Sequence, residues 1–182
     1  AESITSDVLG KRIGQINVFF WDACVYSHFS ISINRFICIT FPMKAGTFFT
    51  HRIIGLFIGI PWLFGFFHIV PYFFVNECFI AYDAISWTWN FAVTECGYII
   101  SIYFDFTSGL VVMGAMICVD MCTLFNLRKL HKEVSLAGKD SSQRRSLETK
   151  FFMQSLCQSA IFALELSSFY FISAVAKNQW QV

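Results

Sequence analysis

The sequence predicts an all-α membrane protein, and three observations support this: its composition, its long apolar segments, and the clustering of its charges between them. Hydrophobic residues make up 56% of the 182-residue chain and charged residues only 14%, whereas soluble domains carry about 25% charged residues. So few charges would not cover the surface of a soluble domain of this size. A single domain that fills residues 1–182 within a lipid bilayer is therefore expected.

Four segments predict membrane-spanning helices. Each is predominantly apolar and at least as long as the roughly 20 residues that cross a hydrocarbon core of about 30 Å. In chain order they are 13–40, 53–74, 99–124 and 151–176. The second contains no Lys, Arg, Asp or Glu, and the fourth has Glu165 as its only charged residue. The first is the most polar, so it needs a lining of protein or water rather than lipid.

The loops between these segments predict the orientation. Basic residues gather in the loops 41–52 and 125–150, whereas the loop 75–98 contains no Lys or Arg. Lys and Arg in short loops stay on the cytoplasmic side. The first and last of these loops are therefore expected inside the cell and the loop 75–98 outside.

Two cysteines, Cys78 and Cys96, fall in the outer loop, where the compartment is oxidising. A bond between them would close the loop over the helices and stabilise it by roughly 3 kcal/mol. Two unpaired thiols, or a bond to a cysteine outside this chain, are the alternatives.

Aromatic residues are frequent in the same loop, including Tyr82, Trp87, Trp89 and Tyr98. Trp and Tyr gather at membrane–water interfaces, so an interface belt is the favoured interpretation. The alternative is that these rings cover a ligand pocket.

Polar residues repeat at helical spacing in two of the segments. One stripe comprises Asn17, Trp21, Cys24, His28, Ile31 and Arg35, and the other comprises Gln154, Gln158, Ile161, Glu165 and Ser168. Such stripes are expected to face the bundle interior, either as a watery pocket or as hydrogen bonds between helices. A carboxylate at membrane depth favours function, so Asp105 and Glu165 are candidate site residues. His68 is expected to be a packed, hydrogen-bonded residue.

Several function classes are disfavoured. The chain has no phosphate-binding glycine loop, no nucleophile motif and no His or Cys pair at metal-ligand spacing. We therefore expect no enzyme activity, no cofactor and no metal, and the charge balance argues against nucleic acid. A four-helix channel or transporter, with Asp22, Asp105, Asp120 and Glu165 along a cation path, remains the main rival, although no internal symmetry supports it.

One further motif carries a family resemblance. Asn34, Arg35 and Phe36 are followed by an apolar stretch that ends in Phe41 and Pro42. This sequence resembles the third transmembrane helix of the nematode serpentine chemoreceptors of class X. Shorter similar stretches begin at Leu9, Glu95 and Phe151, so the resemblance extends over nearly the whole chain and rests on their order and spacing.

The resemblance implies that the four helices correspond to helices three to six of a seven-helix receptor bundle in the plasma membrane, with sensory cilia as a further expectation. It implies that the receptor senses a small molecule and signals through a heterotrimeric G protein. Asn34, Arg35 and Phe36 would then form the G-protein coupling motif. The expected ligand pocket comprises Asn17, Trp21, Asp105 and Glu165.

The motif differs from that of rhodopsin-like receptors because Asn34 replaces an acidic residue beside the arginine. Glu148 is the candidate partner for Arg35 at the inner side. The chain is expected to be a fragment or a truncated form of the receptor, and a nonfunctional truncated product is the alternative.

Overall fold

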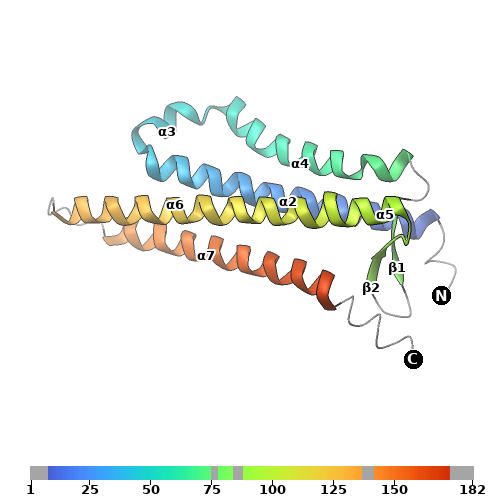
Figure 1. Ribbon diagram of the computed structural model, residues 1–182. Coiled ribbons are helices and arrows are strands. Elements are labelled where there is room, and N and C mark those ends of the chain that lie inside the picture. Colours follow the sequence, from blue (N-terminus) through green and yellow to red (C-terminus); the bar gives the residue numbers. More distant parts are fainter. Residues whose placement is uncertain (1–7, 75–77, 84–87, 137–141, 173–182) are drawn as a thin grey trace.

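Long helices lie side by side in the computed structural model, with a short β-hairpin at one end (Figure 1). The structure describes residues 8–74, 78–83, 88–136 and 142–172. The end that carries the hairpin is called the hairpin end here, and the opposite end, which carries the short helix α3, is called the α3 end.

The first two long helices are joined at the α3 end. Helix α2 runs over Val8–Thr40, α3 over Pro42–Phe48 and α4 over His51–Phe74. Pro42 stands in the first turn of α3, where its fixed φ suits a helix start and its missing N–H removes no hydrogen bond. The loop expected at 41–52 thus contains a helix.

The segment 75–98, expected to be an outer loop, contains a hairpin. Strand β1 (Ile80–Asp83) pairs in antiparallel fashion with β2 (Thr88–Phe91), and Ile80 lies opposite Phe91. Helix α5 (Glu95–Ile99) follows. Thr94 caps it, because its side-chain oxygen accepts a hydrogen bond of 3.0 Å from the backbone N–H of Gly97.

The second half of the chain forms two long helices, each with a π-helical part at the hairpin end. The π-helix η1 (Ile100–Thr107) continues α5 and leads into α6 (Ser108–Leu136). Helix α7 (Ser142–Ser167) returns and ends in the π-helix η2 (Ser168–Ile172). Composition does not predict such widened turns, which are frequent at functional sites.

The expected inner loop 125–150 is wrong in its bounds, because α6 continues to Leu136 and α7 already begins at Ser142. The helices were expected to stop where charged residues begin. Lys, Arg and Glu are good helix formers, so both helices extend past their apolar segments. At the other end, the helix expected from residue 99 begins at Glu95.

Helix α2 is the centre of the bundle, since it contacts α4, α6 and β1, and α6 in turn contacts α7. Figure 1 shows α2 between α4 and the α6–α7 pair. Of the described helices, two are long and apolar enough to cross a membrane, His51–Phe73 and Glu95–Lys129.

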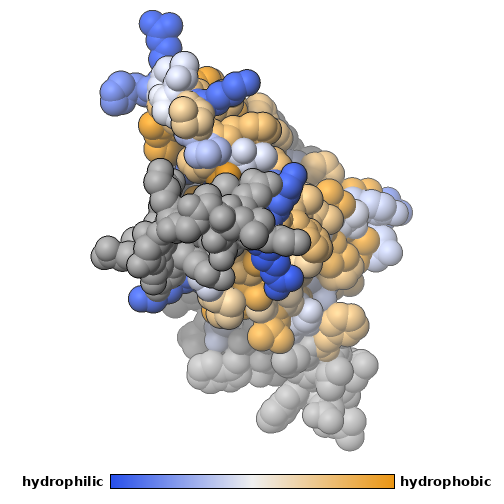
Figure 2. Space-filling model, turned by 90° about the vertical axis from the view of Figure 1, so that its left-hand side faces the viewer, coloured by the Kyte–Doolittle hydropathy of each residue, from blue (hydrophilic) through white to orange (hydrophobic). Residues whose placement is uncertain are grey.

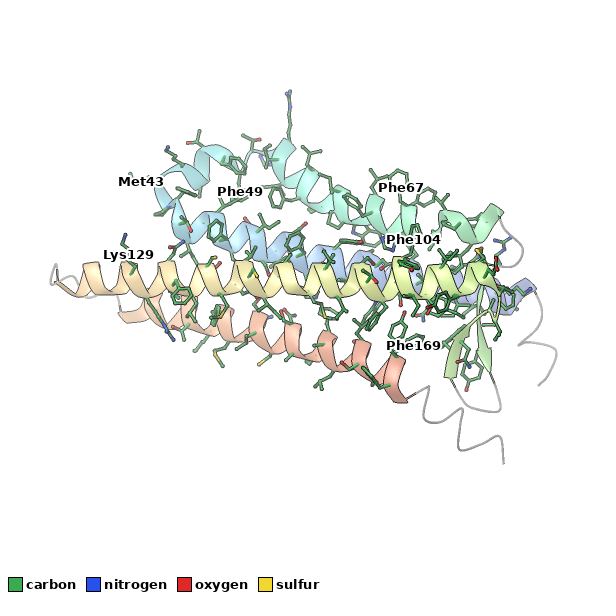
Figure 3. The ribbon with its side chains drawn as sticks, viewed as in Figure 1. Met43, Phe49, Phe67, Phe104, Lys129 and Phe169 are labelled. Atoms are coloured by element: carbon green, nitrogen blue, oxygen red, sulfur yellow. A yellow bond between two sulfur atoms is a disulfide. The ribbon has the colours of Figure 1, made fainter. Side chains whose placement is uncertain are left out.

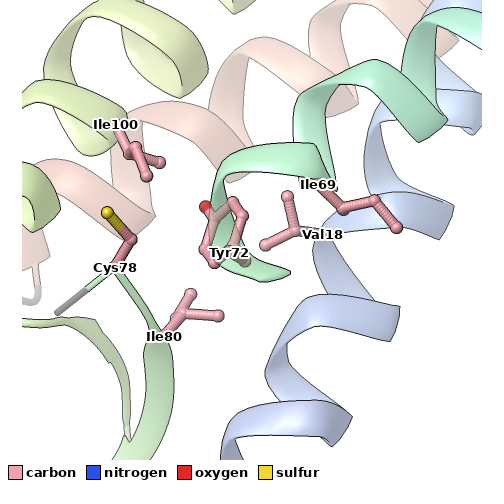
Figure 4. Packing of buried hydrophobic residues seen from close by; sticks show 6 residues of the cluster. All are labelled: Val18, Ile69, Tyr72, Cys78, Ile80 and Ile100. Carbon is pink, nitrogen blue, oxygen red and sulfur yellow. The ribbon is translucent and has the colours of Figure 1, made fainter. Parts of the chain in front are cut away.

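Two apolar clusters hold the bundle together. The first lies at the hairpin end, where Val18 of α2, Ile69 and Tyr72 of α4 and Ile100 of η1 surround Ile80 and Cys78 (Figure 4). The second lies further along and joins α2, α6 and α7 through Val25, Met113, Met116, Phe162 and Leu166. Together the two clusters connect the four long helices and the hairpin.

The polar stripe expected on residues 154–168 faces the interior only at the hairpin end, where Glu165 and Ser168 line a cavity. Ser155, Ser159, Phe162 and Leu166 are the buried residues of α7, whereas Gln154, Ile161 and Glu165 are exposed. The buried face of α7 is therefore displaced by one residue from the expected stripe, and Ser155 on this face donates a hydrogen bond to Asp120 of α6. In α2, likewise, Gln15 and Asp22 are buried while Asn17 is exposed.

Candidate functional site

A cavity of about 460 Å³ opens at the hairpin end. This volume lies within the roughly 300–1,000 Å³ of small-molecule sites. Its walls come from α2, both strands of the hairpin, η1, and the α7–η2 junction. Segments that are far apart in the sequence therefore meet around one space.

The hairpin is tied down over this end of the bundle. Cys78, which is buried, forms a disulfide with Cys96, and their Cα atoms are 5.3 Å apart. This is the pairing expected from the outer loop. Gly14 of α2 and Gly97 of α5 allow the backbone to pack closely, since a Cβ on Gly14 would collide with the carbonyl of Ile80 and one on Gly97 with that of Ala92.

The two π-helical segments face each other and are joined by Tyr170 of η2. Its hydroxyl lies 2.8 Å from Oδ2 of Asp105 and 2.7 Å from the carbonyl oxygen of Ser101. A tyrosine hydroxyl has one hydrogen to donate, so it serves one of these two acceptors fully at a time. The site thus has more acceptors than donors at Asp105.

Aromatic rings make up much of the remaining wall. Trp21 packs edge-on against Phe162 with ring centroids 5.7 Å apart, and Phe91 of β2 meets Phe169 of η2 at 6.1 Å. Figure 3 shows Phe169 on the side of η2 that lies toward the hairpin. Trp89 of β2 also lines the cavity, so for this residue the structure favours the alternative that loop aromatics cover a pocket. Trp87 lies outside the described residues.

The four residues expected to form a pocket meet in this cavity: Asn17, Trp21, Asp105 and Glu165 all line it. Asn17 and Trp21 come from one face of α2, whereas Asp105 and Glu165 come from helices separated by the whole α6. Helical spacing indicated the first pair. The second pair was indicated by the cost of a carboxylate at membrane depth.

Sequence reasoning missed a polar cluster between α2 and α4. Nδ1 of His68 lies 3.3 Å from Oδ2 of Asp22, and Nε2 lies 2.9 Å from the hydroxyl of Tyr26. Nε2 and the tyrosine hydroxyl are hydrogen-bonded, whereas the buried Oδ2 of Asp22 contacts Nδ1 only at ion-pair distance and has no hydrogen-bond partner among the described residues. His68 is hydrogen-bonded, as expected. Its two partners, Asp22 and Tyr26, were missed because they do not belong to the polar stripe of α2 that runs from Asn17 to Arg35.

The motif that was expected to couple to a G protein lies at the α3 end. Asn34 is exposed, and Arg35 and Phe36 are half-buried, close to the end of α2. Nearby, Asn126 of α6 donates a hydrogen bond of 2.9 Å to Thr40 of α2. The side chain of Glu148, the expected partner of Arg35, lies outside the described part of the chain. Within the described residues, no group of three or more His, Cys, Asp or Glu is placed to hold a metal ion.

Residues 2–182 match the family described as serpentine type 7TM GPCR chemoreceptor Srx. The chain belongs to this family.

Two relatives come from Caenorhabditis elegans. Serpentine receptor class X 45 is 25% identical over an alignment of 182 positions, which covers 93% of this chain and 48% of the relative. Serpentine receptor class X-43 is 25% identical over 150 positions, which covers 82% of this chain and 46% of the relative. The chain thus spans about half the length of these relatives. No solved structure matches it.

Proposed function

We propose that the chain is part of a G-protein-coupled chemosensory receptor that binds a small molecule in the hairpin-end cavity. Its four long helices take the places of helices three to six in a seven-helix bundle of the plasma membrane, with the hairpin end outside. The α3 end then contacts a heterotrimeric G protein, and sensory cilia are the proposed site of action.

The observation that carries this proposal is the meeting of Asn17, Trp21, Asp105 and Glu165 around one cavity, beneath a hairpin tied by a disulfide. The Asn34–Phe36 motif stands at the opposite end of the same helix, α2. A ligand and a G protein would therefore act on two ends of one helix.

The channel alternative requires its four carboxylates along one path. Of these four carboxylates, Asp105 and Glu165 line the cavity, whereas Asp22 and Asp120 do not. Asp22 contacts His68, and Asp120 accepts a hydrogen bond of 3.1 Å from Ser155. These separate pairings favour the receptor.

The test is G-protein recruitment in cells that express the full transcript encoding this chain, screened with a small-molecule panel. Arg35→Ala is expected to abolish recruitment, and Arg52→Ala, an exposed basic residue at the same end, is the matched control. Ligand-gated ion flux without G-protein recruitment would contradict the proposal and support a channel.

We also propose that Glu148 is the inner partner of Arg35. Each single charge reversal, Arg35→Glu or Glu148→Arg, is expected to change basal G-protein recruitment, and the double reversal to restore it. A double reversal that behaves as the sum of the two single reversals would count against the pair.

A further inference from the structure

The charges that line the hairpin-end cavity share one sign. Asp105 and Glu165 contribute carboxyl groups from two different elements, η1 and α7, and the described lining contains no Lys, Arg or His. A space bordered by two acidic groups and no basic group attracts cations and repels anions.

The basic residues at the start of α2 are engaged elsewhere. The ammonium of Lys11 lies 4.0 Å from the ring centroid of Phe79. The guanidinium of Arg12 lies 5.2 Å from the ring of Phe73 and donates a hydrogen bond of 2.9 Å to Gln15. Neither residue lines the cavity, so Asp105 and Glu165 meet no basic side chain among its described lining residues.

The hydrogen bonds at these carboxyl groups leave acceptors without matching donors. The single hydrogen of Tyr170 is shared between Asp105 and the carbonyl of Ser101. The hydroxyl of Ser168, which also lines the cavity, already donates to the backbone carbonyl of Glu165 at 2.9 Å. A ligand that brings several N–H donors and no acceptor would complement this imbalance, and an ammonium group is such a ligand.

The rest of the wall is aromatic. Trp21, Trp89, Phe91 and Phe169 line the cavity, and ring faces attract cations more strongly where water is excluded. The same rings bury an apolar group attached to the cation.

Taking the proposed function as its basis, we infer that the hairpin-end cavity binds a small organic cation, a protonated amine that carries an aromatic or branched apolar group. The ammonium binds between Asp105 and Glu165. The apolar group packs among the four aromatic rings.

The test measures binding to the full 182-residue chain in lipid nanodiscs by saturation-transfer NMR, with empty nanodiscs as the blank. Three probes of similar shape differ in charge: 2-phenylethylammonium, 2-phenylethanol and 3-phenylpropionate. The ammonium is expected to bind about tenfold or more tightly than the alcohol, because charge-assisted hydrogen bonds are stronger than neutral ones. The propionate is expected to bind weakest.

Variants locate the effect. Glu165→Gln is nearly isosteric at an exposed position and is expected to weaken ammonium binding about tenfold while leaving alcohol binding unchanged. Glu95→Gln is the matched control, since it removes an exposed carboxylate of the same end that does not line the cavity. It should leave all three affinities unchanged.

The inference is overturned if the alcohol or the propionate binds as tightly as the ammonium, or if Glu165→Gln leaves ammonium binding unchanged. Saturable alcohol binding that Trp21→Ala abolishes would mean that the ligand class is wrong and the cavity still a ligand site. If none of the probes binds saturably, the inference fails. The Arg35→Ala recruitment experiment then decides separately whether the receptor function stands.

Discussion

At the hairpin end, α4 packs against α2 through Pro61, Gly65, Ile69 and Tyr72, which recur at helical spacing and are all buried. At the α3 end of the same helix, no residue of His51–Ile60 is buried. Figure 3 shows Phe49 between α3 and α4 and Met43 pointing away from the bundle. Figure 2, which views the α3 end, shows hydrophilic groups there beside the hydrophobic sides of the helices.

The described connections between helices and strands also differ between the hairpin end and the α3 end. The hairpin end has the Cys78–Cys96 disulfide, the Asp22–His68 contact, and a hydrogen bond of 2.9 Å from Gln15 to the backbone of Tyr72. At the α3 end, Asn126 and Thr40 join α6 to α2. The disulfide and the buried face of α4 thus distinguish the hairpin end, which shapes the ligand cavity in the proposed receptor, from the α3 end, which would contact the G protein.

Removing the Cys78–Cys96 disulfide is expected to give the largest loss of stability among the changes that compare the two ends. Cys78→Ser with Cys96→Ser should lower the free energy of unfolding by about 3 kcal/mol, because the closed loop loses its constraint. Thermal unfolding in nanodiscs measures the effect. Cys118→Ser, an exposed free cysteine, is the control and should change stability by less than about 0.5 kcal/mol. Equal losses from the two changes would show that the hairpin end is not specially constrained.

Two glycines of α4 provide a matched test. A Cβ on Gly65 would lie 3.0 Å from the backbone N of Ala23 in α2, whereas one on Gly59 would meet nothing within 4 Å. Gly65→Ala should therefore destabilise the bundle by about 1–3 kcal/mol through overpacking. Gly59→Ala should be neutral or stabilising by up to about 1 kcal/mol, since alanine favours helices. A reversed order in SDS-induced unfolding would refute the close packing of α2 and α4.

The polar cluster between α2 and α4 gives a smaller effect. A double-mutant cycle with Asp22→Asn and His68→Phe should yield a coupling of about 1–1.7 kcal/mol, near the upper range for hydrogen bonds in membrane bundles. Thermal unfolding of the two single variants and the double variant measures it. Strict additivity of their effects would mean that the Asp22–His68 contact adds nothing to stability.

The corresponding cycle at the α3 end should give the smallest value. Asn126→Ala and Thr40→Ala are expected to couple by about 0.6 kcal/mol, the typical value for an interhelical hydrogen bond. The same unfolding experiment applies. A coupling above that of Asp22 and His68 would remove the distinction between the two ends.

Much of this arrangement follows from the sequence, and the rest depends on packing. The apolar segment 53–74 predicted α4 to within two residues, because a long uncharged run has one favourable solution in lipid. The Asn17–Trp21 face and the carboxylates Asp105 and Glu165 also indicated the cavity residues.

The π-helical turns were not predicted, since they meet through contacts between segments far apart in the sequence. The hairpin was not predicted either, although its two strands are close in the sequence. The hydroxyl of Tyr170 in η2 bonds to the carbonyl of Ser101 in η1, 69 positions away in the sequence. No local sequence pattern predicts that contact. The buried stripe of α7 is displaced by one residue from the expected one, because Ser155, rather than Gln154, faces Asp120 of α6 and donates a hydrogen bond to it.

Membrane orientation is the most direct test of the account. Val93 at the hairpin end and Met43 at the α3 end are 93% and 92% exposed, so each accepts a cysteine without disturbing the core. A membrane-impermeant maleimide applied to intact cells should label Val93→Cys, and should label Met43→Cys only after permeabilisation. The unsubstituted chain gives the background. Labelling of Met43→Cys from outside, or of both positions in intact cells, would contradict the proposed receptor topology.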